Sequence, residues 1–309
     1  MSVASHRRPG AARVGPVSAV LGAAVLFGTT GTAQALGPAG TTSLGVGAVR
    51  LAGGAVALAV IAWARRPPAR RRWRAHAPAL LLGGLGIAIY QLCWFAGLRR
   101  TGVALGTIVG IGSAPVFAGV LHLLAGHGLS RAWIAGTGAT VMGAALLAQR
   151  GAGGVSVDPL GLAFMAGAGL SYTVYTVAAK RSIDRGLDAA GATAAMFVAG
   201  AVLMSPLLVV EPLGWIGSPQ GMVMALHLGV VTIGLAYWLY AWGLSHLSVP
   251  TVVTLTLAEP LTAAILGIAI LDEQVGPLGL AGAAVIAVGL VLAASGERRT
   301  AAPPESAAA

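Results

Sequence analysis

The sequence predicts an all-α integral membrane protein with ten transmembrane helices, arranged as two inverted five-helix repeats. Of its 309 residues, 57 % are hydrophobic and 9 % are charged, whereas a typical soluble domain has about 25 % charged residues. The apolar residues form ten stretches of about 20 residues, the length that a helix needs to cross the hydrocarbon core of a bilayer. The two halves of the chain also resemble each other in their pattern of glycine and proline.

Ten spans follow one another along the chain, separated by short loops of the kind that join neighbouring antiparallel helices. Six spans begin near a proline, at Pro16, Pro78, Pro159, Pro219, Pro250 and Pro277. Proline suits the first helical turn because its missing N–H would have no partner there. The predicted spans are 16–36, 42–64, 77–97, 102–124, 130–149, 158–180, 189–210, 219–243, 249–271 and 276–295.

These spans predict four regions. Residues 1–15 form a cytoplasmic tail, 16–149 the first repeat, 158–295 the second repeat, and 296–309 a disordered cytoplasmic tail.

The formal charge of +10 would suit a nucleic-acid partner, but the arginines lie in loops beside apolar spans. In that position they orient helices, so we expect no nucleic acid. If the N-terminus is cytoplasmic, ten spans place both termini on the cytoplasmic side of the cell membrane. Fifteen basic residues then lie on that side: Arg7, Arg8, Arg13, Arg65, Arg66, Arg70, Arg71, Arg72, Arg74, Arg131, Lys180, Arg181, Arg185, Arg298 and Arg299. Arg99, Arg100 and Arg150 fall in segments on the outer side of the membrane. Arg99 and Arg100 are the main exceptions to the rule that basic residues gather on the cytoplasmic side. The dense run 65–74 is either a topology anchor or a site for anionic lipids.

The internal repeat appears at a shift of 145 or 146 residues. The larger shift pairs Gly83 with Gly229, Gly97 with Gly243, Gly136 with Gly282 and Gly143 with Gly289; the smaller pairs Gly22 with Gly167, Phe27 with Tyr172 and Pro115 with Pro260. A repeat of five helices crosses the membrane an odd number of times, so the second copy is upside down. Many secondary transporters have this architecture, with the substrate held between the repeats near the midplane.

A family resemblance rests on the segment LAEPLTAAILGIAILDEQVGPLGLAGAAVIAVGLVLAA, from Leu257 to Ala294. It resembles the closing helix pair of the EamA family, within the drug/metabolite transporter superfamily. Glu259–Pro260 followed by Asp272–Glu273 is its most specific part. The first half is similar around Pro115 but has Ser113–Ala114 in place of the acid.

The resemblance implies a ten-helix fold and the transport of small metabolites, most often export. It also implies a cavity lined by the first four helices of each repeat, with the fifth and tenth as scaffold. Arg50, in LGVGAVRLAGGAVAL, resembles an arginine often found in the second helix of the family.

Arg50 lies near the middle of the second span, where an unpaired charge costs roughly 3 kcal/mol on insertion scales. It should therefore face a wet cavity or a partner. Either it binds a carboxylate or phosphate of the substrate through its two-pronged guanidinium, or it bonds helix carbonyls as a structural residue. Its repeat counterpart, near Ala195–Met196, is apolar, so the fold itself does not require a cation there.

Glu259 is the one acid well inside a predicted span. Pro260 cannot donate a backbone hydrogen bond, which leaves the carbonyl of Thr256 free and predicts a helix break. A second break is predicted at Pro115. Burial disfavours the charged form of a carboxyl group, so Glu259 either carries a coupling proton or has a structural or gating role.

Aromatic and amide side chains form the remaining transport-pathway candidates: Tyr90, Gln91 and Trp94 in the third span, Tyr172 and Tyr175 in the sixth, and Trp238 in the eighth, beside Tyr237, Tyr240 and Trp242. Tyr90 and Trp94 are four residues apart and share one helical face. A polar-tipped aromatic cavity suits an amphipathic organic solute. The alternative is an aromatic belt at the membrane interface. Thr29, Thr30 and Gln34 are further hydrogen-bonding candidates.

The sequence shows no metal-ligand spacing, catalytic triad or phosphate loop, so we expect neither an enzyme nor a cofactor. It favours a secondary transporter that exports an amino acid, metabolite or drug-like solute by alternating access. The alternatives are a membrane enzyme acting on a lipid-linked substrate and a passive channel. The stripe Gly106, Gly110, Ala114, Ala118 predicts close helix packing, within one subunit or in a homodimer.

Overall fold

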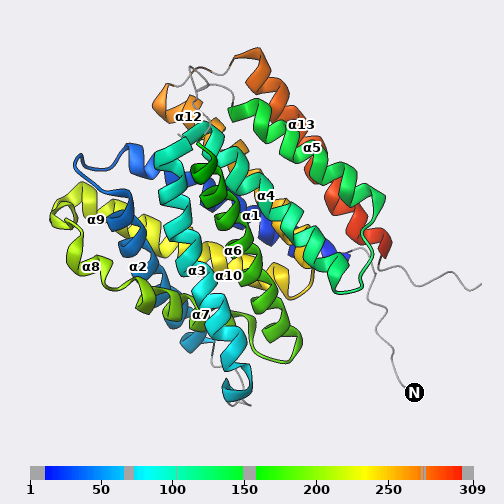
Figure 1. Ribbon diagram of the computed structural model, residues 1–309, viewed down its shortest axis with the longest axis horizontal. Helices are drawn as coiled ribbons and strands as arrows, with labels where there is room; N and C mark the ends of the chain where they lie inside the picture. Colours follow the sequence, from blue (N-terminus) through cyan, green and yellow to red (C-terminus); the bar gives the residue numbers. More distant parts are fainter. Residues whose placement is uncertain are drawn as a thin grey trace, which may run out of the picture.

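The computed structural model describes residues 11–65, 73–101, 103–148, 158–272, 274 and 276–300, and this part of the chain is helical with no strand (Figure 1). The helices are α1 Ala11–Ala35, α2 Ser43–Ala64, α3 Trp73–Thr101, α4 Val103–Leu124, α5 Arg131–Ala148, α6 Pro159–Asp184, α7 Ala189–Met204, α8 Leu207–Val210, η2 Gly214–Gly217, α9 Pro219–Leu226, η3 His227–Leu235, α10 Ala236–Leu244, α11 Val249–Leu255, η4 Thr256–Ala258, α12 Glu259–Leu271 and α13 Pro277–Thr300.

Seven continuous helices in the described residues are long and apolar enough to cross a bilayer. They are Gly15–Ala35, Ser43–Ala64, Trp73–Thr101, Pro159–Asp184, Pro219–Leu244, Val249–Leu271 and Pro277–Ser295. The apolar stretches Val109–Leu124 and Ala189–Met204 are shorter. The chain is therefore a multi-pass membrane protein, and the count of ten crossings stays a prediction.

Several helix ends differ from the predicted boundaries: α3 covers 73–101 where 77–97 was predicted, and α6 continues to Asp184 where the prediction ended at 180. The helix predicted over 189–210 ends at Met204, because Pro206 cannot continue its hydrogen bonds, and a four-residue helix follows. Residues 11–15 and 296–300, predicted as parts of the tails, are helical. The remainder of both tails, with Arg66, Arg70, Arg71, Arg72, Arg150 and Glu273, lies outside the described residues.

Most of the helix packing joins one half of the chain to the other. Helix α1 packs against α10 and α12, and its counterpart α6 packs against α3 and α4. Likewise α2 packs against η3, while α7 packs against α3. The last helices of the two halves, α5 and α13, lie side by side at one edge of the bundle (Figure 1). Each contact thus has an equivalent with the roles of the halves exchanged.

The α5–α13 contact reveals the symmetry in detail. A Cβ atom added at Gly136 would lie 2.6 Å from the carbonyl oxygen of Gly289, and one added at Gly143 would lie 2.6 Å from that of Gly282. The repeat pairs Gly136 with Gly282 and Gly143 with Gly289, so exchanging the halves turns one contact into the other. The start of α5 meets the end of α13, which makes the two helices antiparallel. The axis relating the halves is therefore perpendicular to these helices.

We predict that Gly136→Ala destabilises the protein by about 1–3 kcal/mol, because the new methyl group meets backbone that cannot rotate away. The measurement is the melting temperature of the detergent-solubilised protein. Gly138→Ala is the matched control on the same helix, since a Cβ there meets nothing within 4 Å. Equal melting temperatures for the two variants would contradict the close helix approach.

Arg100, which opposes the charge rule, has a structural partner at the start of α6. Its Nη1 donates to Oδ2 of Asp158 at 3.0 Å, while Oδ1 of Asp158 accepts the N–H of Leu160 at 2.9 Å. Asp158 is thus the N-cap of α6, held by a cation at the last turn of α3. The hydrogen bond from Arg100 lowers the pKa of Asp158 from 3.8, with the backbone N–H groups of Gly161 and Leu160 assisting. Arg99 is exposed and makes no ion pair with any residue that the structure describes.

We predict a pH-dependent effect of Arg100→Gln on stability. Since Asp158 has a lower pKa in the folded protein, its contacts stabilise the fold above the unfolded pKa and lose this effect as the pH falls. The variant should melt slightly below the wild type at pH 7, and the difference should vanish below about pH 4. Arg99→Gln is the control and should show no such difference. A gap that is independent of pH would refute the pairing.

Candidate functional site

A cavity of about 120 Å³ lies between the two halves of the bundle. Its lining residues come from α1, α2, α3, α4, α6, α10, η4 and α12: Phe27, Thr30, Gln34, Arg50, Tyr90, Gln91, Trp94, Phe95, Gly110, Ile111, Ala114, Tyr172, Tyr237, Thr256 and Glu259. The structure therefore brings together six of the eight predicted transport-pathway residues, Arg50, Tyr90, Gln91, Trp94, Tyr172 and Glu259, together with the further candidates Thr30 and Gln34. A smaller void of about 10 Å³ shares part of this lining, including Arg50 and Tyr237, and adds Tyr175.

Arg50 supplies the positive charge of the lining. Its Nε atom is buried and has no hydrogen-bond partner, so the structural alternative, in which it bonds helix carbonyls, is not seen at this atom. No ion pair within 4.0 Å joins Arg50 to Glu259 in the described residues. A buried polar group without a partner is costly, and an anion or water in the cavity would remove that cost.

The N-terminal end of α2 positions Arg50. Thr42 caps the helix by accepting the N–H of Gly45, and its hydroxyl donates to the Glu211 carboxylate at 2.5 Å. On the neighbouring helix, Gln91 Nε2 donates to the carbonyl of Gly47 at 3.4 Å, which joins α3 to α2. Gln91 therefore contributes to the cavity wall and also fixes the helix that carries Arg50.

Glu259 begins α12, directly after a turn of 3₁₀ helix, Thr256–Ala258. The prediction that the carbonyl of Thr256 has no donor is wrong, because the tighter turn lets the N–H of Glu259 donate to it. At Pro115, by contrast, α4 continues with no change of helix type. Helix α1 approaches so closely that a Cβ at Gly28 would lie 2.8 Å from the carbonyl oxygen of Glu259.

The small-residue stripe of α4 is used within the subunit. Thr173 on α6 donates to the carbonyl of Ala114 at 3.0 Å, and a Cβ at Gly169 would lie 2.8 Å from the carbonyl oxygen of Gly110. The stripe thus brings α4 against α6 beside the cavity. A homodimer stays a prediction.

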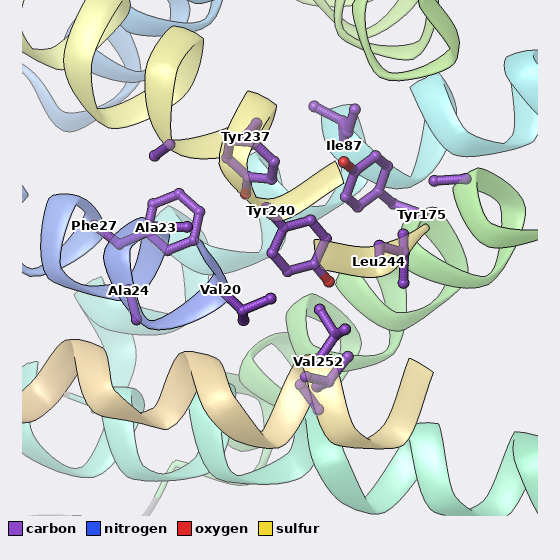
Figure 2. Close-up of a cluster of buried hydrophobic side chains, with 14 of the residues drawn as sticks. Val20, Ala23, Ala24, Phe27, Ile87, Tyr175, Tyr237, Tyr240, Leu244 and Val252 are labelled. Atoms are coloured by element: carbon purple, nitrogen blue, oxygen red, sulfur yellow. The ribbon is translucent and has the colours of Figure 1, made fainter. Parts of the chain in front are cut away.

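All five tyrosines of the chain gather in and beside the cavity wall. The ring centroids of Tyr90 and Tyr172 are 5.9 Å apart, those of Tyr175 and Tyr237 5.9 Å, and those of Tyr237 and Tyr240 5.7 Å. Figure 2 shows Tyr175, Tyr237, Tyr240 and Phe27 meeting in one cluster. This clustering between the halves of the bundle excludes the interfacial belt as the explanation for the tyrosines.

The tyrosine hydroxyl groups differ in their hydrogen bonding. Tyr240 bonds the hydroxyl of Thr176 at 2.7 Å. The hydroxyls of Tyr172 and Tyr175 are buried beside those of Tyr240 and Thr193, and within the described residues neither makes a hydrogen bond of 3.5 Å or less. Tyr172 lines the cavity with its ring, whereas the hydroxyls of Tyr172 and Tyr175 are buried in this conformation and Tyr240 is bonded to Thr176.

We predict opposite effects for two matched variants. Tyr175→Phe should leave the melting temperature unchanged or raise it, because it removes an unsatisfied buried hydroxyl. Tyr240→Phe should destabilise the protein by about 1 kcal/mol, because it leaves Thr176 without this partner. Thermal unfolding in detergent tests both, and a larger loss for Tyr175→Phe would show that its hydroxyl is bonded.

Trp238 does not line the cavity, and the candidate chosen from the eighth span was misplaced by one residue. The guanidinium carbon of Arg65 lies 5.7 Å from the centre of its ring, as in a cation–π contact. Its neighbour Tyr237 lines the cavity instead, because successive residues of a helix point about 100° apart. Phe27 was also missed, although its pairing with Tyr172 in the repeat could have indicated it.

A π-helix, His227–Leu235, precedes Tyr237. His227 Nε2 lies 2.9 Å from the hydroxyl of Thr29 on α1. A Cβ at Gly229 would lie 3.2 Å from the Cα of Gly53 on α2. The π-helix therefore contacts both α1 and α2, two helices that line the cavity.

Comparison with known proteins identifies the family. A model of the EamA-like transporter family matches residues 15–149 and again residues 159–295. The chain belongs to the EamA-like transporter family. It is 36 % identical over 282 residues to the uncharacterized transporter YwfM of Bacillus subtilis (strain 168), covering 91 % of this chain and 94 % of that protein.

One solved crystal structure of another protein shares the fold. It superposes with a TM-score of 0.79 at 21 % identity, covering 94 % of this chain and all of its own. Together, the family match and the named relative point to a membrane transporter for a small molecule rather than to an enzyme.

Proposed function

We propose that this EamA-like transporter is a secondary transporter that exports a small organic metabolite with an anionic group. Ten helices, as two inverted five-helix repeats in the cell membrane, would move it by alternating access. The observation that carries the proposal is the unpartnered Nε of Arg50 in a cavity between the halves.

The cavity chemistry supports a solute with both a charged and an aromatic or apolar part. Arg50 offers charge-assisted hydrogen bonds to a carboxylate or phosphate. Trp94 and the tyrosines offer flat apolar faces. A bare ion would have little use for these rings. A passive channel would need an open path, whereas Tyr175 and Tyr240 block one end of this cavity with side chains at most 1 % exposed.

The direction of transport is proposed from topology. The cavity reaches exposed Gln34 near the end of α1, which the predicted orientation, with both termini in the cytoplasm, places on the outer side. A cavity that reaches this side is where an exporter would release its solute.

We predict that Arg50→Ala abolishes export. The test compares all metabolites outside cells that overexpress the wild-type chain, Arg50→Ala or the exposed control Arg99→Ala. A solute that accumulates with the wild type and the control, but falls at least about tenfold with Arg50→Ala, names the cargo, since one lost charged hydrogen bond is worth about 1.5–3 kcal/mol. Unchanged accumulation in Arg50→Ala at equal membrane levels refutes the assignment of Arg50.

We further predict that Glu259 couples export to protons, because it is the one carboxylate in the described lining. Glu259→Gln keeps the size of the side chain but cannot exchange a proton. In vesicles, it should abolish the acceleration of transport by an imposed pH gradient and leave exchange at equal pH intact. Full gradient-driven transport by Glu259→Gln would remove the coupling role.

A further inference from the structure

The two ends of the cavity are unequal, although the halves of the chain are equivalent. Gln34 lines the cavity and is exposed. The shift of 145 that pairs Phe27 with Tyr172 pairs Gln34 with Ala179, which is 0 % exposed. One end of the molecule is therefore open where the equivalent position at the other end is sealed.

The sealed end is closed by side chains of α6 and α10. The rings of Tyr175 and Tyr240 stack with centroids 6.3 Å apart, and the hydroxyls of Thr176 and Tyr240 lie 2.7 Å apart. All three residues are at most 1 % exposed. Tyr240 therefore acts as a plug, and Thr176 is the hydrogen-bonding partner that holds it.

Contacts elsewhere fix the register of the repeat near these residues. Thr173 meets the carbonyl of Ala114, and Gly28 meets that of Glu259; a shift of 145 turns one contact into the other. Similarly, Gly97 meets Met165 while Gly243 meets Val20. In these two contacts Val20 on α1 and Met165 on α6 are 145 residues apart, whereas Gly97 on α3 and Gly243 on α10 are 146 apart. The shift is therefore 145 between α1 and α6, and 146 between α3 and α10.

In this register the counterparts of the plug lie at the open end. Tyr175 corresponds to Thr30, Thr176 to Gly31, and Tyr240 to Trp94. Thr30 and Trp94 both line the cavity. A Cβ added at Gly31 would meet nothing within 4 Å, so there is free space on α1 at the position that corresponds to Thr176.

We propose that the mouth of the cavity closes when the indole of Trp94 packs onto Thr30 and Gly31 of α1. The large ring fills the space that the glycine leaves, as Tyr240 fills the space beside Tyr175 and Thr176 at the other end. The proposal rests on the alternating access proposed above, because the opposite end can open only when this one closes. It gives Trp94 a gating role and assigns Gly31 as the surface that receives it.

The test follows the opening of the sealed end with a thiol at Ala179. Cys93 is the single cysteine of the sequence. The parent is therefore the full chain with Cys93→Ala and Ala179→Cys, solubilised in detergent, and the measurement is the rate of labelling by N-ethylmaleimide. Gly31→Leu is added to occupy the place of the indole, and Trp94→Ala is added separately to remove the ring. Gly138→Leu is the matched control, since it also adds a side chain where a helical glycine has nothing within 4 Å.

Gly31→Leu and Trp94→Ala should each slow labelling about tenfold, because overpacking or the loss of the ring disfavours the conformation in which the mouth is closed. Gly138→Leu should label at the parent rate. Labelling of Gly31→Leu at the parent rate, or equal slowing in Gly138→Leu, overturns the gate but leaves the metabolite screen and the transport proposal untouched. A thiol that stays unlabelled in the parent, even after Thr176→Ala weakens the plug, overturns alternation and the gate together.

Discussion

The close approach of helix backbones from opposite halves is the constraint on which the rest of this structure depends. Lipid tails are as apolar as the side chains of the helices, so no hydrophobic effect drives the helices together. They associate instead through van der Waals contact and hydrogen bonds. Glycines at the α5–α13, α2–η3 and α3–α7 crossings let backbone meet backbone. The contacts join the halves more than they join neighbours within one half. The cavity is therefore an interface between two units, and its walls move if the units do.

Symmetry of the scaffold contrasts with asymmetry of the chemistry. Arg50 corresponds to the apolar pair Ala195–Met196, and Glu259 corresponds to Ala114. The packing tolerates either kind of residue at these positions, so the charges are not required by the fold. Both line the cavity where the two halves meet, so the charge of the lining is distributed unequally between the halves. The same reasoning explains why Arg100 differs: its charge is exposed and paired with the N-cap of α6.

Much of the architecture could be predicted because lipid imposes a simple pattern on sequence. Long apolar stretches predicted the helices, and the paired glycines at positions 136, 143, 282 and 289 predicted the repeat, whereas the contact that they make between α5 and α13 came from the structure. Arg50 and Glu259 were found because charges inside spans are rare. Details that depend on hydrogen bonds between residues close in sequence were not predictable from hydropathy. The 3₁₀ turn that gives Thr256 a donor belongs to this group. The choice of Tyr237 over Trp238 depends instead on the rotation of α10, and the early end of α7 follows from Pro206, which the predicted span of 189–210 had passed over.

The π-helix of residues 227–235 has a consequence for how the wall of the cavity can change. A π-helix uses more residues per turn than an α-helix, so the rotation of α10 about its own axis depends on how many residues this segment winds in. If part of this segment rewound as regular α-helix, α10 would rotate about its own axis. The ring of Trp238 would then replace that of Tyr237 on the wall, and the lining of the cavity would change without any helix moving sideways.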